Sequence, residues 1–229
     1  MRMVSELIGG VFVKELKNRF LCEVLIDNEE TICYVPSSCH LSNFLNLEGK
    51  KVLLIKNTGR NTRTEYALFA VPYKRNYILL NTSAANEAIE NTLMSKKFGY
   101  LGFRSDYIRE HNVEGYKCDF FLPNSRTIIE AKSVLSLNKN AVFPTVYSER
   151  TIDQLVELSS LLLRGYKVVF YIASLHPYVD CIYIDTKTVF YKQLKQCIDN
   201  GLILKACTVR TEGFTCKIDK HIPVVIEEE

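Results

Sequence analysis

The sequence predicts a two-domain α+β protein, in which a small β-barrel is followed by an α/β domain. Its 229 residues are enough for one large domain or two small ones. The first third of the chain consists of short strand-like runs separated by turn residues. From Ser83 onward, strand-like runs alternate with helical patterns, which is typical of an α/β layer structure. We therefore expect one domain at residues 1–82 and a second at residues 83–229.

Six runs of strand length make up the N-terminal part. They are rich in β-branched and aromatic residues and read VFVKEL, RFLCEVLI, ETICYVP, KKVLLIKN, TEYALFAVPY and NYILLN. Turn-forming stretches such as DNEE and NTGRN separate them. Five or six short strands at this spacing predict a small barrel of the OB type. That fold often binds nucleic acid, although a fold alone does not establish a function.

The C-terminal part begins with a predicted helix, SAANEAIENTLMSKKFG, which has Ser83 as its N-cap and Gly99 near its end. Three strand-like runs follow: RSDYIREHNV, KCDFFL and RTIIEAKSV. A second helix, ERTIDQLVELSSLLLRG, ends at Gly165. Its amphipathic stripe is predicted to consist of Ile152, Leu155, Val156, Ser159, Leu162 and Leu163. The last elements are two strands, KVVFYIAS and LILKACTVR, and a helix between them, TVFYKQLKQCIDNG.

The composition is that of an ordinary globular protein, with 47% apolar and 24% charged residues. No apolar run approaches the roughly 20 residues that a membrane-spanning helix needs. The N-terminus lacks a signal-peptide pattern, so we expect a cytoplasmic protein with no membrane partner. The eight cysteines include no C-x-x-C pair, which argues against a zinc site. A net charge of +3 is too small to indicate a nucleic-acid partner by itself.

A basic window between Lys50 and Arg75 holds seven basic residues and one acid, Glu65. Two interpretations fit it equally well: a surface that faces phosphates, or a solvated pair of hairpins that happens to be basic. In the first, the candidates for binding nucleic acid include Lys56, Arg60 and Arg63. Nearby aromatic residues could stack bases, but a place in the barrel core is favoured for most of them: Tyr66, Phe69, Tyr73 and Tyr77.

The stretch CDFFLPNSRTIIEAKSV, residues 118–134, predicts a hairpin that presses two carboxylates together. With a four-residue loop at 123–126, Asp119 lies directly across from Glu130, with Cβ atoms roughly 5 Å apart. Side chains alternate along a strand, so Lys132 shares the face of Glu130. A register shifted by one residue would send one carboxylate to the other face.

Like charges placed opposite each other destabilise a sheet, and three arrangements relieve them: a shared proton, an intervening lysine, or a divalent cation. Mg²⁺ takes oxygen ligands and is commonly held by one or two carboxylates plus phosphate. In that arrangement Lys132 would orient the attacking water. An ordinary Glu/Lys pair on a surface hairpin explains the same residues. The apolar neighbours favour a place inside the sheet, where a carboxylate without a function is costly. The metal site and the ordinary Glu/Lys pair are therefore equally favoured.

A D-x-E-x-K pattern with a variable first spacer, on a hairpin followed by a helix, resembles the PD-(D/E)xK nuclease superfamily. Several further segments resemble the sugar fermentation stimulation protein (SfsA) family: RFLCEV, YVPSSCHLSNFL, LLNTSAANEAI, CDFFL, IIEAKSV, VFPTVYSERTIDQLVEL and YIASLHP. The resemblance covers most of the chain. It implies an N-terminal OB-like β-barrel followed by a restriction-endonuclease-like α/β domain. It also implies DNA binding, regulation of sugar-utilisation genes, and nuclease activity on DNA or RNA.

The resemblance implies roles for individual residues. Asp119, Glu130 and Lys132 match the catalytic motif, and the two acids would hold Mg²⁺ or Mn²⁺. Glu110 matches an upstream acid that assists the metal in such folds.

The helix after the hairpin also matches the family, at Glu149 and Arg150, and Arg150 would bind phosphate bidentately. The chain departs from the family's pattern at three places. Gln154 stands where histidine is frequent, Lys117 stands where arginine is usual, and the turn at 37–40 differs. Both Gln154 and Lys117 are kept as candidates for contact with nucleic acid.

The leading prediction is therefore a metal-dependent nuclease with DNA as its partner and RNA as a second candidate. The alternative is a DNA-binding regulator of sugar-utilisation genes that has kept the scaffold without catalysis. A third hypothesis is that the barrel binds a protein partner. The oligomeric state stays open, with a homodimer among the alternatives.

Overall fold

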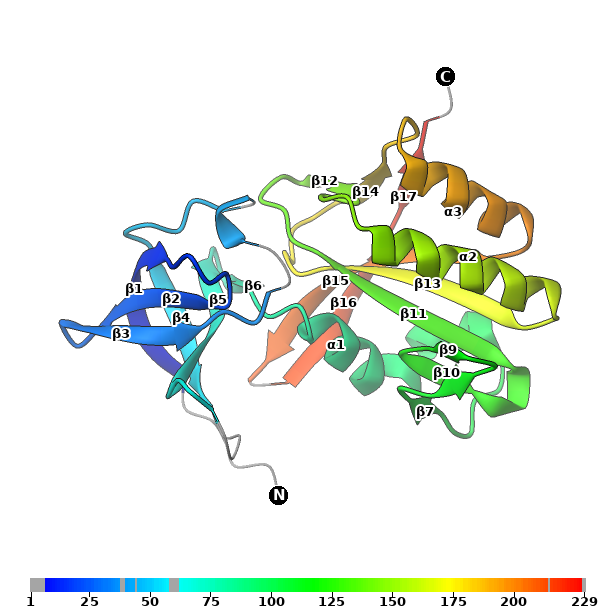
Figure 1. The fold of residues 1–229 in the computed structure, drawn as a ribbon. Coiled ribbons are helices and arrows are strands. Elements are labelled where there is room, and N and C mark those ends of the chain that lie inside the picture. The colour runs from blue at the N-terminus through cyan, green and yellow to red at the C-terminus, as the bar shows by residue number, and fades with distance from the viewer. Residues whose placement is uncertain (1–6, 38–39, 44, 58–61, 214, 228–229) are drawn as a thin grey trace.

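The computed structural model describes residues 7–37, 40–43, 45–57, 62–213 and 215–227, and Figure 1 shows a barrel beside a larger α/β part. The barrel strands are β1 (Leu7–Glu15), β2 (Leu21–Ile26), β3 (Glu29–Tyr34), β4 (Lys51–Lys56), β5 (Tyr66–Tyr73) and β6 (Asn76–Leu79). They pair in the order β3-β2-β1-β4-β5-β6, and a parallel pairing of β3 with β5 closes the sheet. All six strands predicted from the sequence are present.

The barrel strands bury alternate residues, as a half-buried strand should. In β2, Cys22 and Val24 are fully buried, and the residues on either side of Val24 are partly exposed. Gly10 in β1 lies so close to β2 that a Cβ atom there would come within 2.5 Å of Val24 Cγ1. A glycine is required at this position because no side chain fits between the two strands.

The second part is built on a mixed sheet of six strands in the order β16-β15-β13-β11-β10-β7. The strands are β7 (Ile108–Arg109), β10 (Phe120–Leu122), β11 (Thr127–Val134), β13 (Lys167–Ser174), β15 (Ile203–Glu212) and β16 (Thr215–Ile222). The central strands β11, β13 and β15 are parallel, and the outer strands are antiparallel to their neighbours. Helix α1 (Ala84–Leu93) packs on one face of the sheet, and helices α2 (Glu149–Leu163) and α3 (Val189–Asp199) pack on the other.

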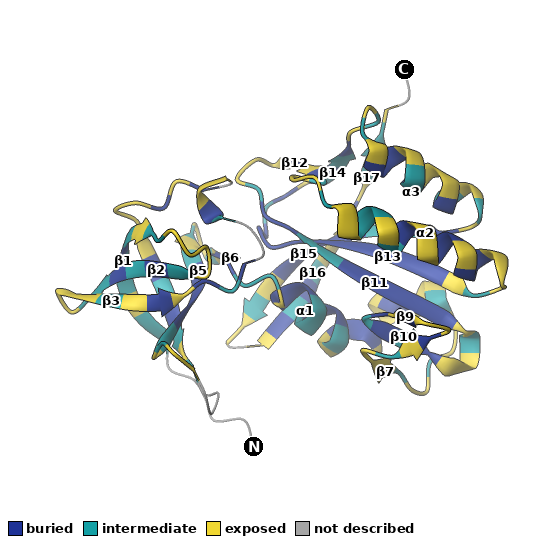
Figure 2. Ribbon diagram, in the orientation of Figure 1, coloured by how far each residue is buried: buried dark blue, intermediate teal, exposed yellow. Residues whose placement is uncertain are grey.

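Alternation along the central strands sends side chains into two separate apolar cores. Ile129 and Tyr171 belong to the core on the α1 side, whereas Ile128 and Phe170 belong to the core under α2 and α3. The first of these cores continues into the interior of the barrel. Figure 2 shows the central strands as a buried layer, with exposed residues along the outer faces of α2 and α3. The barrel and the α/β part are therefore joined by a shared core.

The structure corrects the predicted first helix in two ways. α1 ends at Leu93, because Ser95 begins a separate 3₁₀ helix, Lys96–Leu101, in which its side chain accepts a hydrogen bond from Lys97 N at 3.2 Å. Ser83 occupies the N-cap position, but its side chain makes no capping hydrogen bond. Asn81 instead accepts a hydrogen bond from Ser83 N at 3.0 Å.

The predicted apolar stripe of the second helix is partly wrong. Val156 and Leu163 are exposed, whereas Leu158 and Leu161 are buried. The reason is that α2 packs against α3 as well as the sheet, which turns its buried face toward Leu158 and Leu161. Leu155 is buried as predicted.

Short strands outside the main sheet were not predicted individually. β12 (Asn140–Phe143), β14 (Cys181–Ile184) and β17 (Val224–Ile226) form a small parallel sheet, and β8 (Asn112–Val113) pairs with β9 (Tyr116–Lys117). The predicted run at 104–113 is broken by a turn at Glu110, and the run at 117–122 is interrupted by a bend at Asp119. Two further 3₁₀ helices lie at Leu41–Asn43 and Pro123–Ser125. Within the described ranges, no helix has the length and apolar character needed to cross a membrane.

Candidate active site

The β10–β11 hairpin has the predicted register. Leu122 pairs with Thr127 across a loop that contains the short 3₁₀ helix Pro123–Ser125. Asp119 directly precedes β10, and Glu130 lies in the middle of β11. The printed pairs end at Phe120 and Ile129, one residue short of the two acids, so the direct opposition of Asp119 and Glu130 stays a prediction.

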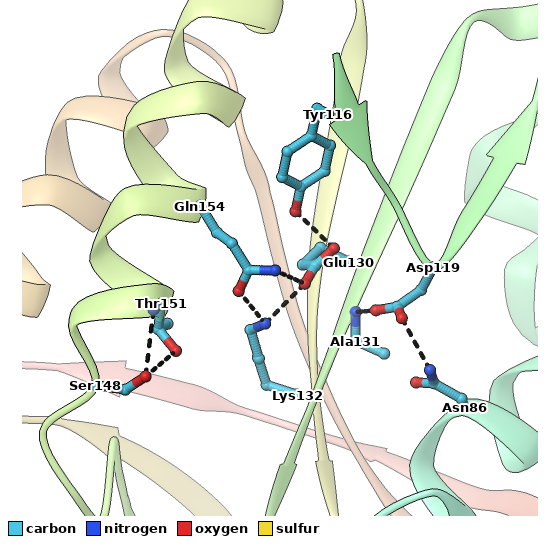
Figure 3. A network of polar contacts seen from close by, with 9 residues as sticks. All are labelled: Asn86, Tyr116, Asp119, Glu130, Ala131, Lys132, Ser148, Thr151 and Gln154. Carbon is cyan, nitrogen blue, oxygen red and sulfur yellow. Dashed lines mark hydrogen bonds and ion pairs between the residues drawn. The ribbon is translucent and has the colours of Figure 1, made fainter. Parts of the chain in front are cut away.

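Glu130 is a buried carboxylate, with only 3% of its surface exposed. No other Asp, Glu, Lys or Arg in the part of the chain that the structure describes is buried to this degree. Its Oε1 accepts hydrogen bonds from Lys132 Nζ at 2.7 Å and from Gln154 Nε2 at 3.0 Å. Its Oε2 accepts one from the Tyr116 hydroxyl at 2.6 Å (Figure 3). Three donors thus offset the water that the carboxylate loses on burial.

Lys132 lies on the same face of β11 as Glu130, which confirms the predicted alternation. Its ammonium also donates to Gln154 Oε1 at 2.6 Å. Gln154 comes from helix α2 and bridges both members of the ion pair, donating to Glu130 and accepting from Lys132. A buried charge pair is stable only when such further bonds satisfy it, so the helix fixes the geometry of the strand residues.

Asp119 is held by a backbone amide of β11 and by a side chain of α1. Its Oδ2 accepts a hydrogen bond from Ala131 N at 2.8 Å, and its Oδ1 accepts one from Asn86 Nδ2 at 2.9 Å. Asn86 belongs to α1, so residues of α1 and α2 anchor the two acids from opposite sides of β11 (Figure 3). Asp119 is partly exposed, whereas Glu130 is buried.

Burial raises the pKa of the Glu130 carboxyl group above its ordinary value, because the charged form loses its hydration. The Lys132 ammonium opposes this rise, and the negative charge of Asp119 adds to it. The folded state therefore binds a proton at Glu130 more tightly than the unfolded chain does.

This shift predicts a pH-dependent stability. A raised pKa means that the contribution of Glu130 is fully present below its unfolded pKa and is lost as the pH rises through its folded pKa. Glu130→Gln removes this titration, so in metal-free buffer we expect its melting temperature, relative to wild type, to increase from pH 4 to pH 7. Thermal unfolding of both proteins across this range tests the effect. A constant difference would contradict the raised pKa.

The two acids and Lys132 line a cleft of about 840 Å³. Its floor is formed by β11, and α1 contributes Asn86. The segment before α2 and its first turns contribute further lining residues, including Tyr147, Arg150 and Gln154. From the barrel side, Arg19 and Ser37 also line it. The cleft thus lies where the barrel meets the α/β part.

Glu110 and Lys117 both line the cleft, but they pair with each other. Lys117 Nζ lies 2.6 Å from Glu110 Oε2, and both side chains are exposed. The hydrogen bond from Lys117 lowers the pKa of the Glu110 carboxyl group. Within the described ranges, no three acidic, histidine or cysteine side chains gather closely enough to hold a metal together. The predicted role of Glu110 in supporting a metal stays a prediction.

The predicted nucleic-acid residues divide between the cleft and the barrel surface. Arg150, Lys117 and Gln154 line the cleft. Lys56 and Arg63 do not, and Lys56 pairs with Glu65 at 3.3 Å. Arg60 lies outside the described residues. The predicted role of the basic window in nucleic-acid binding therefore stays a prediction.

Sequence reasoning missed three residues of the site. Tyr116 and Asn86 hold the two acids, and Arg19 brings a positive charge to the cleft from the barrel. Tyr116 lies two residues before Cys118, so strand alternation could have placed these two side chains on one face. Nothing local in the sequence connects Arg19 or Asn86 to the hairpin.

Models of two protein families match consecutive parts of the chain. Residues 16–80 match the SfsA N-terminal OB domain, and residues 80–213 match the sugar fermentation stimulation protein RE domain. The second match alone covers more than half of the chain. These matches agree with the predicted resemblance and with the predicted order of an OB-like barrel and a nuclease-like domain.

Individual proteins match over similar lengths. A sugar fermentation stimulation protein homolog of Natranaerobius thermophilus is 26% identical, over 99% of this chain and 97% of that protein. A homolog of Clostridium perfringens is 30% identical, over 72% of this chain and 73% of that protein. The solved structure of Pyrococcus furiosus SfsA in complex with Ca²⁺ matches with a TM-score of 0.83 at 18% identity, and the match covers 96% of each chain. This structural match shows a shared fold.

Proposed function

The chain belongs to the sugar fermentation stimulation protein (SfsA) family, and from this premise we propose that it is a metal-dependent nuclease that hydrolyses phosphodiester bonds. One observation supports the proposal above all: a buried glutamate, an aspartate that precedes the neighbouring strand and a lysine line one cleft of about 840 Å³. An ion pair kept only for stability is better replaced by apolar residues, so its retention in a cleft favours a catalytic role.

The donor atoms of the two acids fit a hard divalent cation such as Mg²⁺ or Mn²⁺. A carboxylate has about four lone-pair positions. Internal hydrogen bonds use three of them on Glu130 and two on Asp119. Roughly one position on Glu130 and two on Asp119 remain for a cation, and phosphate oxygens would complete its coordination. The relative from Pyrococcus furiosus was solved in complex with Ca²⁺, which also takes oxygen ligands.

When bound, such a cation supplies positive charge that polarises the phosphate and offsets the charge that develops during hydrolysis. Lys132 contributes from the protein side. Its ammonium has three protons, and two are directed at Glu130 and Gln154. The third is left for the attacking water or for a phosphate oxygen. Tyr116 and Gln154 keep Glu130 in place while Lys132 acts.

One positive residue at the start of α2, next to the acid Glu149, would hold the phosphate backbone. Arg150 is exposed in the first turn of α2 and lines the cleft. Ser148 caps this helix by accepting a hydrogen bond from Thr151 N at 3.2 Å. The guanidinium of Arg150 can bind phosphate oxygens bidentately, and the positive end of the helix dipole favours an anion there.

Incubation of purified protein with end-labelled DNA and RNA tests the proposal. We expect cleavage in Mg²⁺ or Mn²⁺ and none in EDTA. A preparation of Glu130→Ala, purified in parallel, serves as the control for contaminating nucleases. If wild type and Glu130→Ala give the same products in every condition, the catalytic proposal is wrong.

One observation favours a second candidate, a DNA-binding regulator of sugar-utilisation genes that does not turn over substrate. The Glu130 carboxylate is already satisfied by Lys132, Gln154 and Tyr116, so the site is stable without a cation. A protein of this kind would bind DNA through positive surface charge rather than through the acids.

Replacing Lys56, Arg60 and Arg63 together by alanine tests the second candidate. If the basic window contacts DNA phosphates, each lost contact reduces the slope of log K against log salt concentration by about 0.9. The regulator predicts a slope reduced by roughly 2.7 in the triple variant and unchanged in Asp119→Asn. Fluorescence anisotropy with a labelled duplex at several salt concentrations measures the slope. Equal slopes for wild type and the triple variant would count against the regulator.

A further inference from the structure

Two aromatic rings, each a little over one third exposed, stack with each other on the barrel, at the ends of β2 and β3 that face the α/β part. Phe20 directly precedes β2, and Tyr34 is the last residue of β3. Leu21, the first residue of β2, pairs with Tyr34. The ring centroids are 6.4 Å apart and the ring planes differ by 19°. Phe20 is 37% exposed and Tyr34 is 39% exposed. We call these two rings the aromatic platform.

The aromatic platform adjoins the cleft through Arg19. The guanidinium carbon of Arg19 lies over one face of the Phe20 ring, 4.7 Å from its centroid, and Arg19 also lines the cleft. On the other side, the chain leaving Tyr34 reaches Ser37, a second lining residue. Pro36 between them accepts hydrogen bonds from Thr82 N and Oγ1, at 3.1 and 3.3 Å. The platform is therefore tied to the cleft by chain segments on both of its sides. Figure 1 shows the turn of the β2–β3 hairpin on the far side of the barrel, away from the α/β part.

The backbone holds the platform in place before any ligand arrives. Phe20 N donates to Asn18 Oδ1 at 3.1 Å, and Val35 N donates to the carbonyl of Phe20 at 2.8 Å. The rings thus project from fixed points on two paired strands. A surface that is ordered in advance loses little conformational entropy when it binds.

The charges around the cleft indicate the kind of ligand. Four cations and three acids line it; Lys117 and Lys132 pair with Glu110 and Glu130, and the two arginines, Arg19 and Arg150, add positive charge on either side of these pairs in the chain. The lining includes another exposed ring, Tyr147, with 72% of its surface accessible. Aromatic faces beside cations suit a chain that alternates flat rings with negative phosphates, which is the chemistry of a polynucleotide.

We propose that the aromatic platform binds an unpaired nucleobase, with the adjoining phosphate at Arg19, and that the substrate is a single-stranded nucleic acid. The inference rests on the proposed function and names its substrate class. In a duplex the faces of each base are covered by its stacked neighbours, so they are not available to Phe20 or Tyr34. An unpaired base exposes both faces, and stacking on an aromatic side chain does not depend on base identity. The same chemistry applies to DNA and RNA.

Binding of single strands that contain 2-aminopurine tests the proposal without requiring cleavage. The fluorescence of this base is quenched when it stacks, and the chain contains no tryptophan to interfere. The measurements use wild type in EDTA, with DNA and RNA single strands and the matched duplexes. We expect quenching and tighter binding with the single strands. The double variant Phe20→Leu/Tyr34→Leu should bind them on the order of tenfold or more weakly and lose the quenching.

Two further variants make the result specific to aromatic rings. Phe20→Tyr/Tyr34→Phe keeps both rings and should retain affinity and quenching. Phe103→Leu removes an exposed ring elsewhere on the α/β part and should bind as wild type does. Equal binding by the double leucine variant and wild type would overturn the proposal, as would duplexes that bind and quench as well as single strands. If the protein cleaves no nucleic acid but its binding still depends on the two rings, the platform proposal stands and only the nuclease proposal is refuted.

Discussion

Replacing Glu130 by glutamine is expected to reduce metal-dependent cleavage of nucleic acid by on the order of 10³-fold or more. The amide keeps the shape of the side chain, and its oxygen can still accept from Lys132 or Tyr116. It loses the negative charge that a divalent cation requires. Removal of a single group that stabilises charge in the transition state already costs about 10²–10³ in rate, and loss of a ligand should cost at least as much.

Single-turnover cleavage of a labelled oligonucleotide in saturating Mn²⁺ measures this loss. Glu157→Gln is a matched control, because Glu157 is exposed on the same helix that carries Gln154. The control should cleave as wild type does. A Glu130→Gln protein that retains more than about a tenth of the wild-type rate would show that this carboxylate does not bind a catalytic metal.

Replacing Lys132 by methionine should decrease the free energy of unfolding by about 2 to 3 kcal/mol in metal-free buffer at pH 7. The change leaves a carboxylate that is 3% exposed without its cationic partner. Breaking a fully buried ion pair costs about 3–5 kcal/mol. The Lys132 side chain is 18% exposed, which places the expected value below that range. Urea denaturation of wild type and variant provides the measurement.

The double variant Glu130→Gln/Lys132→Met distinguishes loss of charge compensation from loss of packing. With the negative charge gone, methionine no longer leaves an unpaired ion, so most of the stability should return. A double variant as unstable as Lys132→Met alone would mean that packing, and not the ion pair, accounts for the loss.

The central hairpin was predictable from sequence because its determinants are local. Pro123 and Asn124 favour a turn, the flanking runs are apolar, and strand alternation then fixes which residues share a face. The register and the pairing of Lys132 with Glu130 follow from this pattern. The six barrel strands were predicted for the same reason, since each is a separate run of β-forming residues.

The residues that complete the site were not predictable in the same way. Asn86 reaches Asp119 from a helix 33 positions earlier in the chain, and Gln154 reaches Glu130 from 24 positions later. Arg19 comes to the cleft only because the barrel packs beside the sheet. Such contacts depend on how the elements pack, which periodicity within one element does not encode. The exposed Val156 on α2 shows the same limit, since α3 decides which side of the helix is covered.

The apolar core that runs from the barrel into the sheet has a kinetic consequence. Proteins that close around a ligand do so by moving bodies that meet through a thin interface or a hinge. Here the wall that carries Arg19 and the floor that carries Glu130 are attached to one packed interior. An oligonucleotide should therefore associate in a single phase, with an observed rate constant that increases linearly with its concentration and reaches no plateau.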